Sequence, residues 1–594
     1  MNKILIVKGG IILNNVVKVL KKNGEIVYFN GDKIVNAIQK SAKRSMCTLT
    51  DEEEISVVND VYEQCLKTHD EEVKVSVIHD MVEVALSKVN KNVAESYRSY
   101  RNYKKDFVGM LDQVYNKAQS VLYIGDKENS NADSSLVSTK RSLITGELSK
   151  ELYQRFFLNK DEIQACNDGF IYVHDMRDRM YTLNCCLADV TTIMKDGFEM
   201  GNVWYNEPKT LDTACDVLGD IIMSMASQQY GGYTVAEIDS VLSYYCEKSY
   251  KIYFEEYRKL AIELDSTISL HSLYQKAESY AKDKVYRELE QGIQGLEIKL
   301  NTVASSRGDY IFTTFSFGVD QNEFAQMVSE VILKVRMGGQ GKAGFKKQML
   351  FPKLIFLYDE ELHGKNKPLE HLFDTAVQCS SKSMYPDYLS LSGDGYVADM
   401  YKKYGRIVSA MGCRAYLSPY FEKGGMFPVD ETDKPYFIGR FNIGAITLHL
   451  PLIYQEAKET GKDFYEILDY YLEMIRKIHI RTYEYLGKMK ASTNPIGFTQ
   501  GGFVGGTLGY DDPIAPVLKS ATASFGYTAL NELCQLHYDK SIKEDNSFAN
   551  EVIDYINSKI TQFKEEDGNL YALYATPKPV GGFVATRSKI NSIN

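Results

Sequence analysis

Two cysteine positions in this chain could do nucleophilic or radical chemistry. Cys185 and Cys186 are adjacent, and Cys413 stands between a glycine and an arginine. Successive side chains of an extended segment point to opposite faces, so only one of Cys185 and Cys186 can face a given cavity. Adjacent cysteines also chelate zinc poorly. The glycine before Cys413 favours a tight, exposed loop tip, which suits a reactive sulfur. The alternative for any single cysteine is a small buried hydrophobe, and we expect this for Cys186.

A second set of residues could bind a triphosphate. Lys21 and Lys22 lie in a predicted hairpin turn, which we expect beside the start of the first helix, where Lys33 adds a third positive charge. Free N–H groups and the helix dipole favour anions at that end of a helix. Asn30 and His79 could then contact a base or ribose. The alternative is that the lysine pair belongs to a solvated turn.

The elements that position these lysines form a compact α/β unit over residues 1–108. Two β-like runs, 16–20 and 25–29, flank Asn23-Gly24, which is a strong hairpin signal because both residues tolerate positive φ. Three helices are predicted after the hairpin. The first is capped by Asn30 or Asp32, the second starts at a capping box over residues 50–53, and the third starts at about Val75.

Helical and strand-like stretches alternate from about residue 138 to residue 577. This alternation predicts an α/β barrel-like core of about 460 residues. The polar, turn-rich segment 126–138 would connect the core to the first unit. The helical stretches are 209–227, 322–336 and 464–488, and the strand-like runs are 169–174, 310–317, 353–358, 443–450 and 569–574.

The composition is that of a globular enzyme. The 594 residues include 69 basic and 79 acidic side chains, a net charge of -10, without a long basic run. That balance disfavours a clamp on duplex nucleic acid. No stretch reaches about 18 consecutive apolar residues, so no membrane span is predicted. The ten cysteines show no regular framework and suit a reducing cytosol.

Residues 1–108 resemble an ATP-cone, the regulatory nucleotide-binding module at the N-terminus of many ribonucleotide reductases. The resemblance implies that ATP or dATP binds as an effector through Val19, Lys21, Lys22, Asn30, Lys33 and His79. Such modules often have arginine where this chain has Lys22, which keeps the charge but loses bidentate phosphate geometry. The matching residues are Val19, Lys21, Lys22, Asn23, Gly24, Phe29, Lys33, Ile34, Ile78, His79, Tyr97, Arg98, Tyr100 and Arg101.

Residues 120–577 resemble the catalytic barrel of the anaerobic, class III ribonucleoside-triphosphate reductases, which are glycyl-radical enzymes. The landmarks run in family order along the chain. They are Glu128-Asn129-x-Asn131, Tyr172-Val173-His174-Asp175, Asn184-Cys185-Cys186, Gln229-Tyr230-Gly231-Gly232, Phe351-Pro352-Lys353-Leu354, Met384-Tyr385-Pro386-Asp387, Met411-Gly412-Cys413-Arg414, Gly439-Arg440-Phe441-Asn442-x-Gly444 and Leu573-Tyr574-Ala575-Thr576-Pro577.

This resemblance implies a ten-stranded α/β barrel with a small N-terminal α/β ATP-cone. It implies that Cys413 carries a thiyl radical, which removes the 3′ hydrogen of a bound ribonucleoside triphosphate so that the 2′ hydroxyl leaves as water. Cys185 is expected to supply reducing equivalents from the opposite face of the ribose. Asn442 is expected to hydrogen-bond near the substrate, as in members that use formate as the final electron donor. The expected partners are a second copy in a homodimer and a radical-SAM iron–sulfur activase, in the cytoplasm of an anaerobic bacterium or a phage-infected host cell.

Two C-terminal motifs of that family are not found in this sequence. Family members carry two Cys-x-x-Cys pairs that bind zinc and an Arg-x-x-Gly-Tyr that contains the radical glycine, and neither pattern occurs here. We therefore expect no metal site in this chain. The expected domains are an ATP-cone at 1–108, a catalytic barrel at 109–577 and an unrelated tail at 578–594, with the glycyl-radical module missing or supplied as a separate polypeptide. A truncated or interrupted reading frame is the other explanation.

Other interpretations stay open at the level of sequence. The chain could be a non-catalytic, nucleotide-sensing regulatory subunit or a truncated inactive fragment. A glycyl-radical enzyme of the pyruvate formate-lyase type also uses paired cysteines, but the ATP-cone argues against it. His174 and Asp175 could be only a hydrogen-bonded structural pair at the barrel rim. Gly231 could be the C-cap of a long helix.

Overall fold

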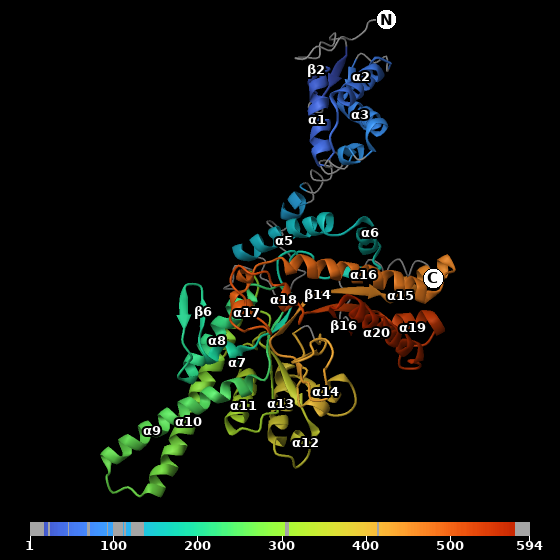
Figure 1. The fold of residues 1–594 in the computed structure, drawn as a ribbon. Coiled ribbons are helices and arrows are strands. Elements are labelled where there is room, and N and C mark those ends of the chain that lie inside the picture. The colour runs from blue at the N-terminus through green and yellow to red at the C-terminus, as the bar shows by residue number, and fades with distance from the viewer. Residues whose placement is uncertain are drawn as a thin grey trace. The chain divides into compact units, whose positions relative to one another are not determined.

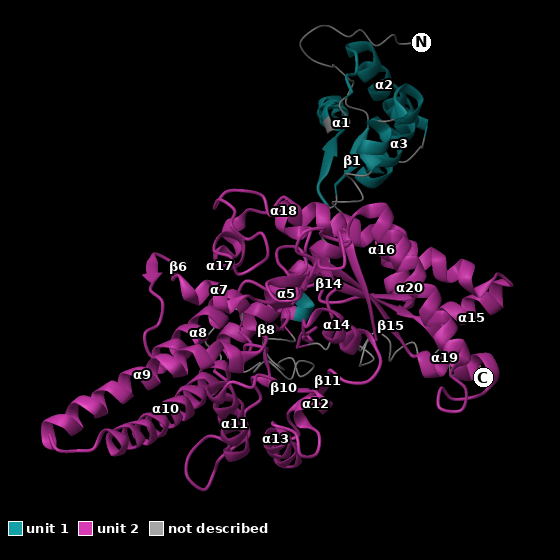
Figure 2. Ribbon diagram, turned by 60° about the horizontal axis from the view of Figure 1, so that its bottom comes forward, with its two compact units in different colours: residues 1–117 teal, residues 118–594 magenta. Residues whose placement is uncertain are grey.

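The chain folds into two compact units, Met1–Lys117 and Ala118–Asn594 (Figure 2). The computed structural model describes residues 17–21, 24–44, 47–67, 72–91, 93–98, 111, 114–119, 136–302, 308–412 and 415–575. Lys22, Cys413 and the predicted tail at 578–594 lie outside these ranges, as does most of the predicted connection at 126–138.

The first unit is a three-stranded sheet packed with helices. Strand β1 (Lys18–Leu20) pairs antiparallel with β2 (Ile26–Tyr28) and parallel with β3 (Glu72–Lys74). The three predicted helices are α1 (Gly31–Arg44), α2 (Asp51–Lys67) and α3 (Val75–Val89). The predicted hairpin and helices of this unit are therefore confirmed.

Side-chain caps set where the first two helices begin. Oδ1 of Asn30 accepts the N–H of Lys33 over 3.3 Å, so Asn30 caps α1, while Asp32 lies inside it. Thr50 and Glu53 bond reciprocally, at 2.8 and 3.3 Å, and form the predicted capping box of α2. The apolar faces of the helices and of β1 pack together in one buried cluster.

The second unit is built on a nine-stranded sheet, in the order β11-β10-β9-β8-β5-β14-β15-β16, with β4 paired to β14. One group of neighbouring parallel strands consists of β5, β8, β9, β10 and β11. The other consists of β14, β15 and β16. The two parallel groups meet antiparallel where β5 pairs with β14. The strands are β4 (Ile171–Val173), β5 (Cys186–Leu187), β8 (Tyr233–Val235), β9 (Thr313–Phe317), β10 (Lys353–Tyr358), β11 (Asp387–Ser390), β14 (Arg440–His449), β15 (Thr522–Thr528) and β16 (Leu570–Ala575).

The predicted α/β class is confirmed, and each strand-like run of the sequence contains a strand of this sheet. In the described residues β11 and β16 are the two ends of the strand order, so a closed ring of ten strands stays a prediction. Two short hairpins lie outside the sheet. They are β6 (Phe198–Met200) with β7 (Val203–Tyr205), and β12 (Tyr420–Phe421) with β13 (Pro435–Tyr436).

Helices connect the strands, and α9 and α10 form a long hairpin that projects away from the sheet (Figure 1). The predicted helical stretches appear as α8, α11 and α16. The helices are α5 (Val137–Phe156), α6 (Lys160–Asp168), α7 (Val190–Lys195), α8 (Leu211–Ala226), α9 (Ile238–Leu264), α10 (Leu270–Leu300), α11 (Glu323–Gly338), α12 (Glu360–His363), α13 (Glu370–Ser383), α14 (Tyr396–Tyr404), α15 (Leu450–Thr460), α16 (Phe464–Gly487), η1 (Ala491–Thr493), α17 (Pro495–Thr499), α18 (Ala515–Leu518), α19 (Leu530–Tyr538) and α20 (Ser547–Asp567).

The two faces of the sheet have different coverings. The main apolar core packs one face against the helices and contains Cys186. A smaller cluster on the other face contains Cys185 and Leu187 together with Met411 and Ala415. Strand β14 lies between the two, and all ten of its residues are buried. The predicted division of the adjacent cysteines between opposite faces is therefore confirmed.

Membrane-spanning helices are absent from the described residues. Within those ranges no helix combines the length and the hydropathy that crossing a bilayer requires.

Candidate functional site

Two strands place Cys185 beside Asn442. Cys185 directly precedes β5, and Asn442 is the third residue of β14. The N–H of Asn442 donates to the carbonyl of Cys185 over 2.8 Å, and the N–H of Asn184 donates to the carbonyl of Asn442 over 2.9 Å. This antiparallel pairing brings together two predicted site residues that are far apart in the sequence.

The sulfur of Cys185 is held by hydrogen bonds on two sides. The N–H of Gly232 donates to Sγ over 3.2 Å, and the Cys185 thiol donates to Oδ1 of Asn184 over 3.3 Å. The side chain is 2% exposed. The sulfur is therefore fixed in position and shielded from water before any ligand arrives.

Gly231 permits the close approach of the backbone to this sulfur. A Cβ at Gly231 would overlap with Sγ of Cys185 and with Oδ1 of Asn184. The alternative that Gly231 is a helix C-cap is wrong, because α8 ends at Ala226 and its C-cap is Ser227. The glycine is needed for space around the thiol rather than for ending the helix.

A chain of side-chain amides runs from Cys185 across the sheet. Nδ2 of Asn184 donates to Oδ1 of Asn442 over 3.3 Å, and Nδ2 of Asn442 donates to Oγ of Ser524 over 2.7 Å. The N–H of Gly444 also donates to Oδ1 of Asn442, over 2.7 Å. One of the two Nδ2 hydrogens of Asn442 is thus used by Ser524, which leaves the other for a ligand. Sequence reasoning missed Asn184 and Ser524, because nothing local to either residue shows this network.

The segment that contains Cys413 begins and ends beside Cys185. Cys413 itself lies outside the described residues. Its neighbours Met411 and Ala415 pack in the same cluster as Cys185, and the N–H of Met411 donates to the carbonyl of Ala415 over 3.0 Å. A Cβ at Gly412 would overlap with Phe312. The described residues on both sides of Cys413 are therefore anchored next to the Cys185 thiol.

Two buried hydroxyls lie on adjacent strands of the same face. Thr234 of β8 and Thr314 of β9 are register partners. Neither Oγ1 has a hydrogen-bond partner among the described residues. A Cβ at Gly412 would also lie close to Oγ1 of Thr314. Buried polar atoms without partners are costly, so these hydroxyls mark a place where a polar ligand fits. No local pattern in the sequence singles out these two threonines.

His174 is a neutral hydrogen-bonding group in this structure. Its Nε2 lies 2.7 Å from Oγ1 of Thr447 and 3.4 Å from the hydroxyl of Tyr574. Burial, and then the charge of Arg179, lower the pKa of His174 to about 4. The imidazole is therefore uncharged near neutral pH, which suits a role in fixing β4 to β14.

Two other thiols of this unit, Cys186 and Cys215, are buried and protonated. Cys186 lies in the helix-covered core, as predicted, and burial raises its pKa. Burial also raises the pKa of Cys215 to about 12. In the part of the chain that the structure describes, no group of three or more His, Cys, Asp or Glu side chains is arranged to hold a metal ion.

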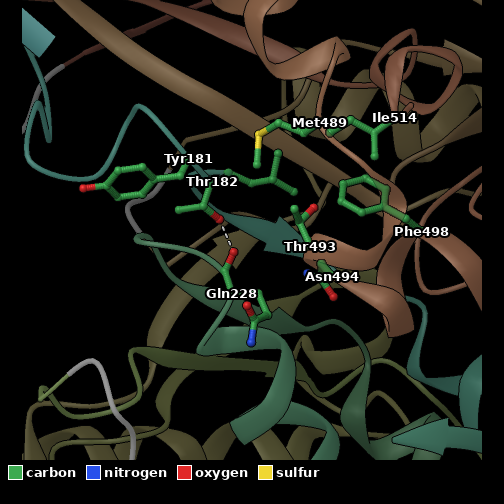
Figure 3. A pocket seen from close by; sticks show the side chains of 9 residues that line it. Tyr181, Thr182, Gln228, Met489, Thr493, Asn494, Phe498 and Ile514 are labelled. Carbon is green, nitrogen blue, oxygen red and sulfur yellow. Dashed lines mark hydrogen bonds between the residues drawn. The ribbon is translucent and has the colours of Figure 1, made fainter. Parts of the chain in front are cut away.

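A small pocket lies close to the segment that leads to Asn184 (Figure 3). The predicted site residues do not line it. Nδ2 of Asn494 is buried there without a partner among the described residues. The lining residues are Tyr181, Thr182, Leu183, Gln228, Met489, Thr493, Asn494, Phe498 and Ile514.

In the first unit, Lys21 and Lys33 lie at opposite ends of the hairpin. Lys21 follows β1 at the turn, where it forms a 2.8 Å ion pair with Glu25. Helix α1 begins at the other end of the ladder, where the N–H of Phe29 bonds to the carbonyl of Val17. The expectation that Lys21 lies beside the start of the helix is therefore wrong, because the return strand carries the chain away before the helix begins. About 10 Å of strand separates the two positions.

The remaining predicted residues of this unit have defined places. Val19 is buried in the apolar cluster of the unit. His79 projects from α3, and its Nδ1 lies 2.6 Å from the hydroxyl of Tyr97. Asn30 caps α1, and Lys33 is exposed in the first turn of that helix. Lys22 lies outside the described residues.

Two family models match this chain. The model described as "Anaerobic ribonucleoside-triphosphate reductase" matches residues 128–578, and the one described as "ATP cone domain" matches residues 17–106. The anaerobic ribonucleoside-triphosphate reductase of Escherichia coli is 30% identical over 576 residues, which cover 94% of this chain and 76% of that protein. The protein of the same name from Enterobacteria phage T4 is 30% identical over 459 residues, which cover 76% of this chain and 70% of that protein.

Solved structures share the fold at low sequence identity. The anaerobic ribonucleotide reductase from Thermotoga maritima in complex with dATP and CTP has a TM-score of 0.51 and 14% identity, over 79% of this chain and 76% of that chain. The structure of that protein with dATP bound in the specificity site has a TM-score of 0.53 and 15% identity, over 80% of this chain and 76% of that chain.

The close approach at Gly231 gives a stability prediction. Gly231→Ala lowers the free energy of unfolding by about 1–3 kcal/mol, because the new methyl group must displace the Cys185 sulfur or the Asn184 amide. Gly295→Ala is the matched control, because it lies in α10 with open space around its Cβ position. The free energy of unfolding of Gly295→Ala should rise by up to about 1 kcal/mol, because alanine has a higher helix propensity than glycine. Urea unfolding followed by circular dichroism measures both, and a Gly231→Ala protein as stable as the wild type contradicts the geometry.

Three buried histidines give a pH prediction. Burial lowers the pKa of His174 and of His449 to about 4, and that of His479 to about 3. Between about pH 6.5 and 4 the unfolded chain binds protons at these positions and the folded chain does not, so stability falls as the pH falls through this window.

His479→Gln tests the sign and size of this effect. Urea unfolding at pH 6 and at pH 5 gives the slope of the free energy of unfolding against pH. This slope should be smaller by about 1.4 kcal/mol per pH unit in the variant. The wild-type protein, measured at the same two pH values, is the reference. An unchanged slope in His479→Gln shows that this imidazole does not resist protonation in the folded protein.

Proposed function

This chain belongs to the anaerobic ribonucleoside-triphosphate reductase family, and from that premise we propose that it reduces ribonucleoside triphosphates to deoxyribonucleoside triphosphates by thiyl-radical chemistry. One observation carries the proposal: Cys185, Asn442 and the two ends of the Cys413 segment lie together on one face of the sheet. ATP and dATP are the proposed effectors of the first unit.

Each of these residues has a distinct part in the proposed reaction. The Cys413 sulfur removes the 3′ hydrogen of the ribose and later returns it. The 2′ hydroxyl takes up a proton and leaves as water, and Cys185 delivers a hydrogen atom from the opposite face. The hydrogen atom of formate then restores the Cys185 thiol, and the second electron of formate reduces the ribose as carbon dioxide leaves. The net change converts the ribonucleoside triphosphate, formate and one proton into the deoxyribonucleoside triphosphate, carbon dioxide and water. Formate is thus oxidised by two electrons, and the ribose is reduced by two.

The geometry around Cys185 suits its proposed role as a hydrogen-atom donor. The thiol is fixed by the N–H of Gly232 and by Asn184, so its hydrogen is directed before the substrate arrives. The remaining Nδ2 hydrogen of Asn442 can donate to a ribose hydroxyl held between the two sulfurs. Burial of the site keeps water away from a reactive sulfur.

A glycyl-radical module is the proposed source of the Cys413 radical. The sequence contains no Arg-x-x-Gly-Tyr, the motif that the family resemblance predicts for the radical glycine. We therefore propose a module outside these 594 residues, charged by a radical-SAM iron–sulfur activase. A homodimer is the proposed assembly.

Effector binding along the β1–β2 hairpin fits the first unit. Lys21 and the start of α1 are about 10 Å apart along the ladder, a span that a nucleoside triphosphate can bridge. The ion pair of Lys21 with Glu25 is exposed, so a phosphate can replace Glu25 at little cost. Lys33 and the N–H groups at the start of α1 add positive potential at the other end.

Cysteine substitutions test the proposed reaction. Cys413→Ala and Cys185→Ala should each reduce turnover by about a thousandfold or more, because each sulfur takes part in bond making. Cys186→Ala is the matched control, because its side chain faces the helix-covered core, and it should keep most of the wild-type activity. The assay measures conversion of CTP to dCTP without oxygen, with formate, S-adenosylmethionine, the activase and a glycyl-radical polypeptide of the family.

The same experiment separates catalysis from nucleotide sensing. Binding of dATP to the first unit should be equal in the wild type and in Cys413→Ala. If Cys413→Ala keeps full turnover, the proposed role of this sulfur is wrong. If no variant or wild-type protein turns over while dATP still binds, the regulatory-subunit interpretation replaces the proposal.

A further inference from the structure

One buried guanidinium in the second unit lacks most of its hydrogen-bond partners. Arg179 lies between β4 and Cys185 in the sequence, and it is 2% exposed. Its Nη1 donates to the carbonyl of Ala445 over 3.1 Å. Its Nε and Nη2 are buried and have no partner among the described residues.

The two unpartnered nitrogens share one edge of the guanidinium. Nε–H and the outer Nη2–H point in parallel, and this fork matches the two oxygens of a carboxylate. The bond from Nη1 to Ala445 holds the other edge against β14. A buried charge whose donors stay unpaired is costly, so this arrangement is stable only if something pairs with the open edge.

The residues around Arg179 do not supply an anionic partner. Burial lowers the pKa of Arg179, but Tyr153, Tyr230 and Asp175 outweigh it, so the pKa is raised and the group stays charged. The hydroxyl of Tyr153 faces the guanidinium and helps to raise its pKa, but burial raises the pKa of this hydroxyl as well, so it stays neutral and does not balance the charge. Asp175 is exposed, and among the ion pairs of the described residues none involves Arg179. The nearby His174 and His479 have lowered pKa values, to about 4 and about 3, and stay neutral.

The open edge lies next to the proposed active site. The guanidinium packs against the backbone of Gly444, where a Cβ would overlap with it. The N–H of Gly444 donates to Oδ1 of Asn442 over 2.7 Å. Tyr230, which also acts electrostatically on Arg179, precedes Gly231, where a Cβ would overlap with the Cys185 sulfur. Arg179 therefore packs directly against β14, two residues from Asn442.

We propose that Arg179 binds the carboxylate of the reductant, a small monocarboxylate, beside Cys185 and Asn442. This inference rests on the proposed function, and it assigns to a single residue the recognition of the second substrate. The two donors of Arg179, Nε–H and Nη2–H, match the two oxygens of a single carboxylate. A triphosphate, with its several negative charges, would need further cations that the neighbours of Arg179 do not provide.

Direct binding of formate tests the proposal without any turnover. The linewidth of ¹³C-formate, titrated with the whole 594-residue protein, should show saturable binding to the wild type. Arg179→Lys should weaken it at least about tenfold, because the charge stays but the fork is lost. Arg179→Met should abolish it. Arg177→Met is the matched control: Arg177 is in the same segment, forms an ion pair with Glu147 and should leave formate binding unchanged.

Thermal unfolding gives a second readout that also shows whether the variants fold. Without formate, Arg179→Met should unfold at the wild-type temperature or above it, because an unpaired buried charge has been removed. Added formate should raise the unfolding temperature of the wild type and not that of Arg179→Met.

Three results would overturn the proposal. They are formate binding to Arg179→Met with wild-type affinity, no saturable formate binding to the folded wild type, and loss of CTP binding in Arg179→Met with formate binding retained. The last would assign Arg179 to the substrate phosphates. A failure of the reductase assay alone would leave the formate-binding result standing, so the two proposals can fail separately.

Discussion

The pairing of β5 with β14 is the contact on which the rest of the site depends. Two parallel groups of strands meet there in opposite directions, and the ladder at the junction is made by Asn184, Cys185 and Asn442. Because hydrogen bonds of a buried ladder cannot be exchanged for water, a shift by one residue would turn Cys185 into the helix-covered core and Cys186 toward the site. The register of one short strand thus selects which sulfur faces the site of the proposed reaction.

Burial on both faces makes this junction rigid and also constrains what can lie beside it. All ten residues of β14 are buried, so each polar group next to the strand needs a partner from the protein or from a ligand. Asn442 has protein partners at both ends of its amide, whereas Thr234, Thr314 and Arg179 keep polar atoms without one among the described residues. These unfilled positions lie on the same side as the Cys185 thiol or are packed against β14 next to it. In the proposed function, the protein supplies a fixed scaffold and the substrates supply the remaining hydrogen bonds.

Sequence patterns predicted local structure well and predicted contacts poorly. The hairpin signal at Asn23-Gly24, the capping box at residues 50–53 and the alternation of helices and strands are local, and each appears in the structure. The division of Cys185 and Cys186 between two faces follows from the period of a strand and was also predictable. The distance between Lys21 and the start of α1 was predicted wrongly, because it depends on how the return strand pairs. The amide network from Asn184 to Ser524 and the open edge of Arg179 arise from residues far apart in the chain, so no local pattern contains them.

The central claim is that one face of this sheet holds the ribose between Cys185 and the segment of Cys413. A crystal structure of the protein with CTP, grown without oxygen, tests this most directly. We expect a ribose next to Sγ of Cys185, within hydrogen-bonding distance of Nδ2 of Asn442, with the residues between Met411 and Ala415 on its opposite side. A nucleotide found only in the first unit, or a ribose away from the Cys185 sulfur, would contradict it.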